Sequence, residues 1–271
     1  NFLVKNSDSE YFVLLNNDTE VGKHWLDEML KTMSRHKNCV ACQPKIKNYY
    51  KRSEFEYAGA AGGFVDVYGF PFCRGRIFNI IEKDLGQYNN EAKIFWGCGV
   101  CLMVKRDFFV GSGMFDEDLH MYAEELDFCW RANIYGKEIW FTPNSEIYHI
   151  GSFSVDSKKI NFIKDYWITR NHIIVPIKNY SFFRLLKILP IKILLEIISA
   201  MRFPNIKAVP FVKSMFSIPL LYIRKIHKKR REIQNNRRIE EKELEEIMNK
   251  RSIALEHFLE GKNKFNQIKI G

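Results

Sequence analysis

The sequence has little of several features that would assign it to a common class. Its longest stretch without Asp, Glu, Lys or Arg is eleven residues, 94–104, whereas a membrane-spanning helix needs about 20 apolar residues. Six cysteines in 271 residues are too few for a disulfide scaffold. The chain begins at Asn1, without an initiator methionine or the regions of a signal peptide. We therefore expect it to start inside a larger protein.

The composition that is present suits a folded protein with one unusual segment. The chain is 46% hydrophobic and 27% charged, with 22 Phe, 12 Tyr and 5 Trp to build a core. Residues 181–231 hold twelve Lys and Arg against one acid, Glu196, while the remainder has 30 bases and 31 acids. Because the net charge of +10 belongs to one segment, we expect no nucleic-acid partner.

Apolar runs and helical spacing divide the first 179 residues into strands and helices. Residues 9–15 predict a buried parallel strand that ends in a polar loop, the position at which open α/β sheets bind ligands. Spacing predicts helices over 24–35 and 122–135. A glycine- and aromatic-rich hairpin or irregular loop is expected over 55–75. The remaining predicted strands are 39–46, 94–104, 138–143 and 146–149.

The composition changes after about residue 179. Residues 182–201 and 208–226 are apolar segments that carry Lys and Arg, and breaks are expected at Pro190, Pro204, Pro210 and Pro219. A charged helix is expected from 228 onward. Basic amphipathic segments lie on anionic bilayers without crossing them. We therefore divide the chain at 1–179, 180–231 and 232–271, and expect 180–231 to bind an anionic membrane surface. A helical subdomain with solvated lysines is the alternative. The membrane contacts would include Lys187, Lys192, Lys228, Lys229, Arg230 and Arg231.

Oxygen and imidazole side chains follow two of the predicted strands. Asn16 and Asp18 alternate after the first strand, so both can present oxygen ligands to a hard cation such as Mg²⁺ or Mn²⁺. The same residues would also form a turn and a helix cap. His149 follows a later strand and is either a metal ligand or structural. Trp96 and Gly97 would allow a ligand to approach the backbone beside an aromatic face, although strand packing explains such a glycine equally well.

Three acids open the helix predicted over 122–135. Glu124, Glu125 and Asp127 lie in its first turn, where the positive end of the helix dipole helps to keep them ionised. That placement suits a general base. The alternative is an acidic helix start in which Asp127 pairs with Arg131 four residues on.

The cysteines include two Cys-x-x-Cys pairs, the ligand count of a zinc site. The pairs are Cys39 with Cys42 and Cys98 with Cys101, and 55 residues separate them. That separation, and their position on predicted strands, favour buried reduced thiols of a cytosolic protein.

Taken in order, several short blocks of this sequence resemble the rhamnosyltransferase-like branch of the family 2 glycosyltransferases. The resemblance covers residues 9–179. The blocks are residues 15–21, residues 57–59 with Asp66 and Gly69, and residues 97–106, 113–117, 122–131, 143–149 and 166–171.

The resemblance implies a fold, a reaction and a cofactor. The fold would be GT-A, an α/β fold with a mixed, mainly parallel sheet flanked by helices, followed here by a helical C-terminal extension. The reaction would move a sugar, with inversion, from a nucleotide-diphosphate donor to a glycan or lipid-linked glycan acceptor in cell-surface polysaccharide synthesis. A divalent metal, Mn²⁺ or Mg²⁺, is implied, and an imidazole ligand favours Mn²⁺.

Roles follow by position in the family's motifs. The metal motif falls on Asn16 and Asp18, the late histidine of the metal site on His149, and the acid pair with the catalytic base on Glu124 and Glu125. The base position is Glu125 where the family has Asp, a side chain one methylene longer.

Further expectations concern the acceptor, the location and the missing front half. We assign Trp96, Gly97 and Asp127 to acceptor binding. The enzyme would be cytoplasmic and peripheral on the inner face of the cell membrane, and a nucleotide-binding half would precede Asn1. The alternative from another class is a non-catalytic carbohydrate-binding or scaffold remnant of such an enzyme.

Overall fold

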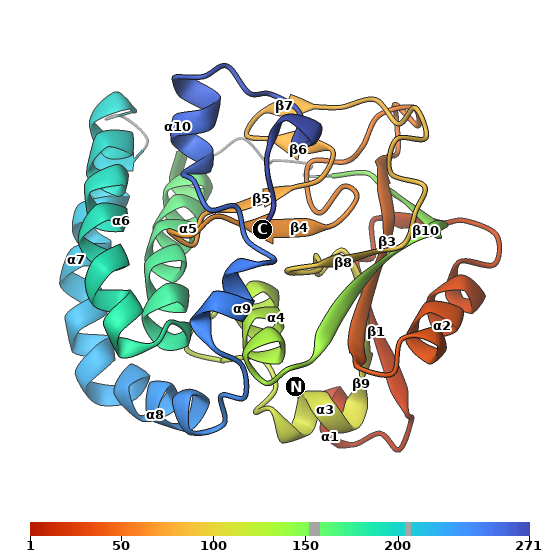
Figure 1. Cartoon of the computed structure of the whole chain (residues 1–271), viewed down its shortest axis with the longest axis horizontal. Helices are drawn as coiled ribbons and strands as arrows, with labels where there is room; N and C mark the ends of the chain where they lie inside the picture. The colour runs from red at the N-terminus through yellow and green to blue at the C-terminus, as the bar shows by residue number, and fades with distance from the viewer. Residues whose placement is uncertain (152–157, 204–206) are drawn as a thin grey trace.

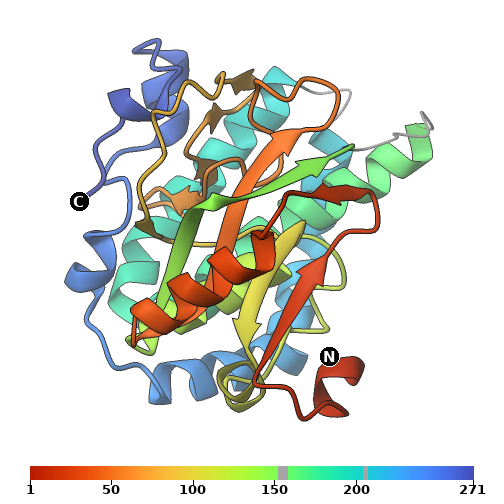
Figure 2. The ribbon, with the colours of Figure 1, turned by 90° about the vertical axis from the view of Figure 1, so that its right-hand side faces the viewer.

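The computed structural model describes residues 1–151, 158–203 and 207–271, so the break expected at Pro204 lies outside the described residues. A central sheet has helix α2 (Trp25–Arg35) on one face and helices α4 (Glu124–Ile134) and α5 (Lys158–Asn179) on the other (Figure 1). Helices α6 (Phe182–Arg202) and α7 (Val209–Leu221) form an outer layer beyond α5 (Figure 1). Pro190 lies inside α6 and Pro219 inside α7, so the breaks expected at these two prolines are corrected. Seen from the side, α2 crosses in front of the sheet (Figure 2).

The central sheet is mixed, which confirms the predicted α/β class. Within the described residues, β3 and β10 pair in parallel and the other pairings of this sheet are antiparallel, so the expected mainly parallel balance is corrected. A parallel pair needs a connection that crosses back over the sheet, and the passage from β3 to β10, which contains α4, provides one. The strand order is β1 (Tyr11–Leu15), β9 (Cys101–Lys105), β3 (Cys39–Asn48), β10 (Glu138–His149) and β2 (Thr19–Val21), with β8 (Ala92–Ile94) also on β10.

Three strand predictions need correction. Strand β1 ends the order of this sheet, pairs antiparallel with β9 and is half-buried rather than buried. The single strand expected over 94–104 is divided, because Trp96 leaves β8 to exchange backbone hydrogen bonds with Gly63. The two strands expected over 138–149 are one strand, β10, whose register against β3 shifts between Thr142 and Glu146.

A small antiparallel sheet confirms the hairpin expected over 55–75. Its strands are β4 (Gly63–Val65), β5 (Pro71–Cys73), β6 (Arg76–Ile77) and β7 (Ile80–Ile81). The carboxylate of Asp66 accepts hydrogen bonds from the backbone N–H groups of Tyr68, Phe70 and Ile253. The hairpin is therefore joined to the C-terminal region.

Helix α2 covers one face of the central sheet with Met29 and Met33, and the expected helix over 24–35 is confirmed. Cys39, Cys42 and Cys101 lie in this α2-side cluster, whereas Cys98 belongs to the core on the opposite face. The four thiols of the zinc alternative are thus divided between two cores. Burial raises the pKa of Cys39 and Cys101 to about 12, which keeps these thiols protonated.

The region beyond α7 is a series of short elements instead of one charged helix. They are the π-helical turn η2 (Tyr222–Ile226), α8 (His227–Asn235), α9 (Glu241–Glu245), α10 (Ile253–Phe258) and the 3₁₀ turn η3 (Phe265–Gln267). Four apolar residues of this region are buried in the main core: Leu244, Met248, Ile253 and Ile268. Short helices α1 (Phe2–Lys5) and α3 (Arg106–Gly111) complete the described elements.

Candidate active site

Asn16, Asp18 and His149 converge where strands β1 and β10 end. Strand β2 pairs antiparallel with β10 so that Thr19 lies opposite His149, and the N–H of Ile150 donates to the carbonyl of Asp18 at 3.0 Å. This pairing brings His149 Nε2 to 3.3 Å from Asp18 Oδ1, and the Asn16 side-chain amide lies 3.3 Å from the same nitrogen. Three candidate ligands from two distant parts of the chain therefore lie close together.

Glu56 orients the imidazole from its other side. Glu56 Oε1 lies 3.4 Å from His149 Nδ1, and its second oxygen accepts the backbone N–H of Ala58. Burial by itself lowers the pKa of His149, but the adjacent carboxylates of Glu56 and Asp18 outweigh burial, so the pKa is raised. A carboxylate on Nδ1 leaves Nε2 as the atom that faces Asp18. Sequence reasoning missed Glu56, although it directly precedes the 57–59 block.

The arrangement fits a divalent cation with oxygen and imidazole ligands. Two ligands at about 2.0–2.6 Å from one ion lie roughly 3–3.5 Å apart, and Asp18 and His149 have that spacing. In the part of the chain that the structure describes, no three His, Cys, Asp or Glu side chains gather as a ready metal site. The third ligand would be Oδ1 of Asn16, and because Nδ2 is the atom that faces His149 here, the amide would turn over to bind the ion. The carboxylate of Asp18 is 39% exposed, which leaves the site accessible.

Replacing Glu56 with Gln is expected to weaken Mn²⁺ binding about ten- to hundredfold, because the imidazole loses the carboxylate that orients it. Isothermal titration of Mn²⁺ into the protein measures the change. Glu28, a partly buried carboxylate on α2 that pairs with Lys31, supplies the control variant Glu28→Gln, which should bind as the unchanged protein does. Equal affinity of the Glu56 and Glu28 variants would remove Glu56 from the site.

The acid pair occupies the first turn of α4, as predicted, but it is more enclosed than an ordinary acidic helix start. Oε2 of both Glu124 and Glu125 is buried, and neither oxygen has a hydrogen-bond partner among the described residues. Burial, then the charge of Glu124, raises the pKa of Glu125 to about 7, although the Gly99 N–H opposes the shift. Burial also raises the pKa of Glu124. A carboxyl that titrates near neutrality can accept a proton at physiological pH.

Cys98 has both Glu125 and Glu56 among the groups that act on it. Burial raises the pKa of its thiol, and the charges of Glu125 and Glu56 add to that rise. Gly59 has a φ of +92°, and a Cβ placed there would lie 2.5 Å from the Cβ of Cys98. The loop after Glu56 therefore packs on Cys98, which directly precedes the Gly99 N–H that faces Glu125.

The residues assigned to acceptor binding are buried, and this assignment is corrected. The Trp96 indole N–H donates to the Phe64 carbonyl at 3.0 Å, and its ring fills the space beside Gly63. A Cβ at Gly97 would lie 2.4 Å from a methyl of Leu102, so this glycine allows core packing.

Asp127 belongs to a buried ionic network, not to a ligand surface. Its carboxylate accepts hydrogen bonds from Arg131 at 3.0 Å and Asn179 at 2.9 Å, and lies 2.8 Å from the ammonium of Lys178. The pairing with Arg131 confirms the alternative given for this residue. Burial acts to raise its pKa, but Lys178 and Arg131 outweigh burial and lower it. Asp127 therefore remains ionised and structural.

The basic residues assigned to the membrane have different surroundings. Lys187, Lys228 and Arg231 are exposed. Lys192 is 0% exposed and lies over the ring of Phe70, and Arg230 is buried and donates to the carbonyls of Ile177 and Tyr180. These two side chains cannot reach a membrane surface, so their assignment as membrane contacts is corrected. Lys229 is half-buried and pairs with Asp116 and Asp118.

Helices α6 and α7 turn apolar residues outward and charged or small residues inward. The buried stripe of α6 is Ile188, Lys192, Glu196 and Ala200, and that of α7 includes Ser214. An ordinary surface helix has the opposite arrangement. None of the described helices is long and apolar enough to cross a bilayer. We define the outer apolar face as Phe182, Phe183, Leu186, Leu194, Ile198, Met201, Val209, Val212, Phe216 and Leu220, all of them exposed.

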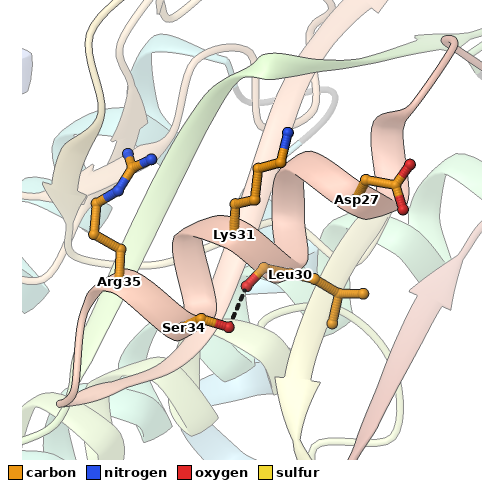
Figure 3. Close-up of a pocket in the computed structure, with 5 residues that line it drawn as sticks. All are labelled: Asp27, Leu30, Lys31, Ser34 and Arg35. Carbon is orange, nitrogen blue, oxygen red and sulfur yellow. Dashed lines mark hydrogen bonds between the residues drawn. The ribbon is translucent and has the colours of Figure 1, made fainter.

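A surface hollow on the outer side of α2 lies apart from these groups. It is lined by Asp27, Leu30, Lys31, Ser34 and Arg35, all of one helix (Figure 3). The Ser34 hydroxyl donates to the carbonyl of Leu30 (Figure 3). The hollow contains none of the candidate metal ligands or bases, so we do not assign the chemistry to it.

Two curated proteins similar to this chain are named for O-antigen biosynthesis and for rhamnosyl transfer. An O-antigen biosynthesis protein of Myxococcus xanthus is 26% identical over 171 residues, which are 62% of this chain and 13% of that protein. An N-acetylglucosaminyl-diphospho-decaprenol L-rhamnosyltransferase of Mycobacterium tuberculosis is 27% identical over 147 residues, 52% of this chain and 47% of that enzyme. The chain resembles rhamnosyltransferase-like family 2 glycosyltransferases. It spans less than half the length of either relative.

Two other comparisons add less. No family model matches the chain. Two solved structures are similar to part of this chain. One is GalNAc-T7 with UDP, GalNAc and Mn²⁺, with a TM-score of 0.47 and 14% identity, and the match covers 65% of this chain and 33% of that one. The other is a mannosyltransferase of Pyrobaculum calidifontis with GDP-mannose and Mn²⁺, with a TM-score of 0.45 and 10% identity, and the match covers 96% of this chain and 66% of that one. Both TM-scores are below 0.5, so the site rests on its own residues.

Proposed function

We propose that this chain is the metal and acceptor side of an inverting glycosyltransferase that uses a nucleotide-diphosphate sugar. The observation that carries the proposal is the Asp18–His149 pair at 3.3 Å, and the enclosed Glu125 carboxyl and the similarity to a rhamnosyltransferase support it. We propose a lipid-linked glycan as acceptor, because that relative's name specifies a sugar-diphosphate lipid. The divisions at residues 179 and 231 remain predictions.

Glu125 acts as the general base in the proposed reaction. Its carboxylate takes the proton of an acceptor hydroxyl while the hydroxyl oxygen forms a bond to the anomeric carbon of the donor sugar. The bond from that carbon to the diphosphate oxygen breaks on the opposite face, and the diphosphate leaves with the electron pair. Attack opposite the leaving group inverts the anomeric centre. Glu124 supports the base through its charge, which raises the pKa of Glu125.

Asp18, His149 and Asn16 would hold the divalent cation, Mn²⁺ or Mg²⁺. When bound, such a cation stabilises negative charge that develops on a diphosphate leaving group. The protein's own contribution is to fix these ligands, and Glu56 does so by orienting the imidazole.

The function is tested by a transfer assay with a panel of nucleotide sugars and a diphospholipid-linked N-acetylglucosamine acceptor. Release of nucleoside diphosphate and a sugar-extended lipid, with inverted anomeric configuration by NMR, is the expected result. The assay also separates an enzyme from a non-catalytic carbohydrate-binding remnant, because a remnant would bind the acceptor and extend none of it.

We propose further that residues 180–231 attach the protein to the inner, cytoplasmic face of the cell membrane. The apolar face of α6 and α7 supports this, because the same helices expose Lys187 and Lys213 and the following helix α8 exposes Lys228 and Arg231. Apolar side chains would enter the acyl boundary of the bilayer while the bases pair with anionic headgroups.

Replacing Phe183 or Phe216 with Ser is expected to reduce partition onto anionic vesicles about tenfold or more, because each ring buries apolar area worth about 1.5–3 kcal/mol. Co-sedimentation with phosphatidylglycerol vesicles measures it. Phe2, as exposed as Phe183 at 77% but on α1, gives the control Phe2→Ser, which should bind unchanged. Binding should also fall as salt rises. Equal loss in all three variants, or equal binding to neutral vesicles, would contradict the proposed surface.

A further inference from the structure

The loop that leads into α4 has an unusual backbone. His120, Tyr122 and Ala123 have φ values of 65°, 65° and 66°, in the left-handed region that side chains other than glycine rarely occupy. Ala123 is also the N-cap of α4 and offers no side-chain cap. The helix that carries Glu124 and Glu125 therefore begins from a strained segment with no local means of holding it.

Asn171 and Arg170, on α5, hold this loop from outside. The amide nitrogen of Asn171 lies within hydrogen-bond distance of the carbonyls of Leu119 at 2.8 Å, Met121 at 2.8 Å and Tyr122 at 2.7 Å. Arg170 donates to the carbonyl of Leu119 at 3.1 Å and to that of Asp118 at 2.6 Å.

The clamp is itself fixed in place. Arg170 Nε donates to the side-chain oxygen of Asn171 at 2.9 Å, which sets the direction of the amide. The guanidinium lies 4.1 Å from the centre of the Trp167 ring, which packs on His120. Asn171 is 0% exposed, so water cannot replace its hydrogen bonds to the loop.

We propose that Asn171, oriented by Arg170, is a positioning residue that holds loop 118–123 in its strained conformation and so fixes Glu125 in its enclosed place. The inference rests on the proposed function for Glu125 as the base. Without the clamp, the loop relaxes toward negative φ and the start of α4 shifts. The Glu125 carboxyl then turns away from the groups that now face it. These groups are Glu124 on α4, the Cys98 thiol and the Gly99 N–H before β9, and the Cys129 thiol one turn along α4.

The first test asks whether the clamp holds the loop. In Asn171→Ala, hydrogen exchange of the amides in 119–126 should accelerate about tenfold or more, since several buried hydrogen bonds to the loop are lost. Asn179 is a buried asparagine on the same helix that contacts Asp127 and not the loop, so Asn179→Ala should leave this exchange nearly unchanged. Adding Ala123→Gly to Asn171→Ala should recover part of the protection, because glycine adopts positive φ freely.

The second test asks whether the clamp positions Glu125, with a readout that needs no turnover. The carboxyl resonance of Glu125, identified by its loss in Glu125→Gln, should titrate about one pH unit or more lower in Asn171→Ala, because the carboxyl gains contact with water. It should not move in Asn179→Ala. In the transfer assay, Asn171→Ala should lower kcat about 10²-fold and have no further effect in the Glu125→Gln background.

The outcomes separate this inference from the proposed function. Unchanged exchange of 119–126, or faster exchange with an unmoved Glu125 titration, overturns the positioning role of Asn171. Full activity of Glu125→Gln overturns the proposed base, while the exchange and titration results still decide whether Asn171 positions that carboxyl. If Asn171→Ala does not fold, the same two measurements are made on Arg170→Lys and judged by the same criteria. That variant loses the hydrogen bond from Arg170 that orients the Asn171 amide.

Discussion

Replacement of Glu125 with Gln is expected to reduce kcat for sugar transfer about 10²–10⁴-fold, the usual contribution of a positioned general base. Gln has the size of Glu but cannot take the acceptor proton. Because Glu125 is not among the candidate metal ligands, Mn²⁺ affinity should stay the same, and the loss should fall on kcat and on kcat/KM alike. Stopped assays of product formation over a range of acceptor concentrations give both constants.

The neighbouring carboxylate supplies the matched control. Glu124→Gln has the same chemical change one residue away and should keep most of the activity. The base must be ionised to work, so activity of the unchanged enzyme should fall as pH drops below about 7. The charge of Glu124 contributes to raising that pKa, so Glu124→Gln should move the acidic limb to lower pH. A Glu125→Gln variant that turns over, or a Glu124→Gln variant that does not, would reassign the base to Glu124.

Replacement of Asp18 with Asn is expected to weaken Mn²⁺ binding about 10²-fold or more and to abolish metal-dependent transfer. Among the described residues, Asp18 is the carboxylate that faces the Nε2 atom of His149, at 3.3 Å. A charged ligand lost from the ion should cost at least as much as a lost outer-shell partner, for which the range is about 10–100-fold. Titration calorimetry with Mn²⁺ and with Mg²⁺ measures the affinities and which ion is preferred.

Asp27→Asn is the control, because Asp27 is an exposed aspartate on α2 that contacts His24 and none of the candidate ligands. It should bind Mn²⁺ as the unchanged protein does. His149→Ala should resemble Asp18→Asn, since both remove a ligand of one ion. Retention of full affinity in the Asp18 variant would place the metal elsewhere, and equal losses in the Asp18 and Asp27 variants would indicate a nonspecific charge effect.

The candidate chemical groups could be predicted from the sequence because they occupy short motifs. Asn16 and Asp18 alternate after a strand, and Glu124 and Glu125 open a helix, so local spacing was enough to single them out. The convergence of Asp18 with His149 was predicted by resemblance. It results from the antiparallel pairing of β2 with β10, a contact between segments about 130 residues apart that periodicity does not encode.

Burial was the property that local patterns could not supply. Trp96, Gly97 and Asp127 appeared suited to an acceptor surface but lie inside, and Lys192 and Arg230 are buried within a segment whose composition predicted exposure. Glu56 and Asn171 gave no strong local signal, because each matters through a partner far away in the sequence, His149 in one case and loop 118–123 in the other.

The sequence by itself therefore determined the α/β class, the segment with excess positive charge and the residue types of the candidate site, since each follows from composition or from spacing within about twenty residues. Only the tertiary structure decided the mostly antiparallel pairing of the described sheet, the outward apolar face of α6 and α7, and the clamp on the loop before Glu125. These depend on which segments meet, and that is set by the packing of the whole core, because any single element can bury its apolar residues against more than one partner.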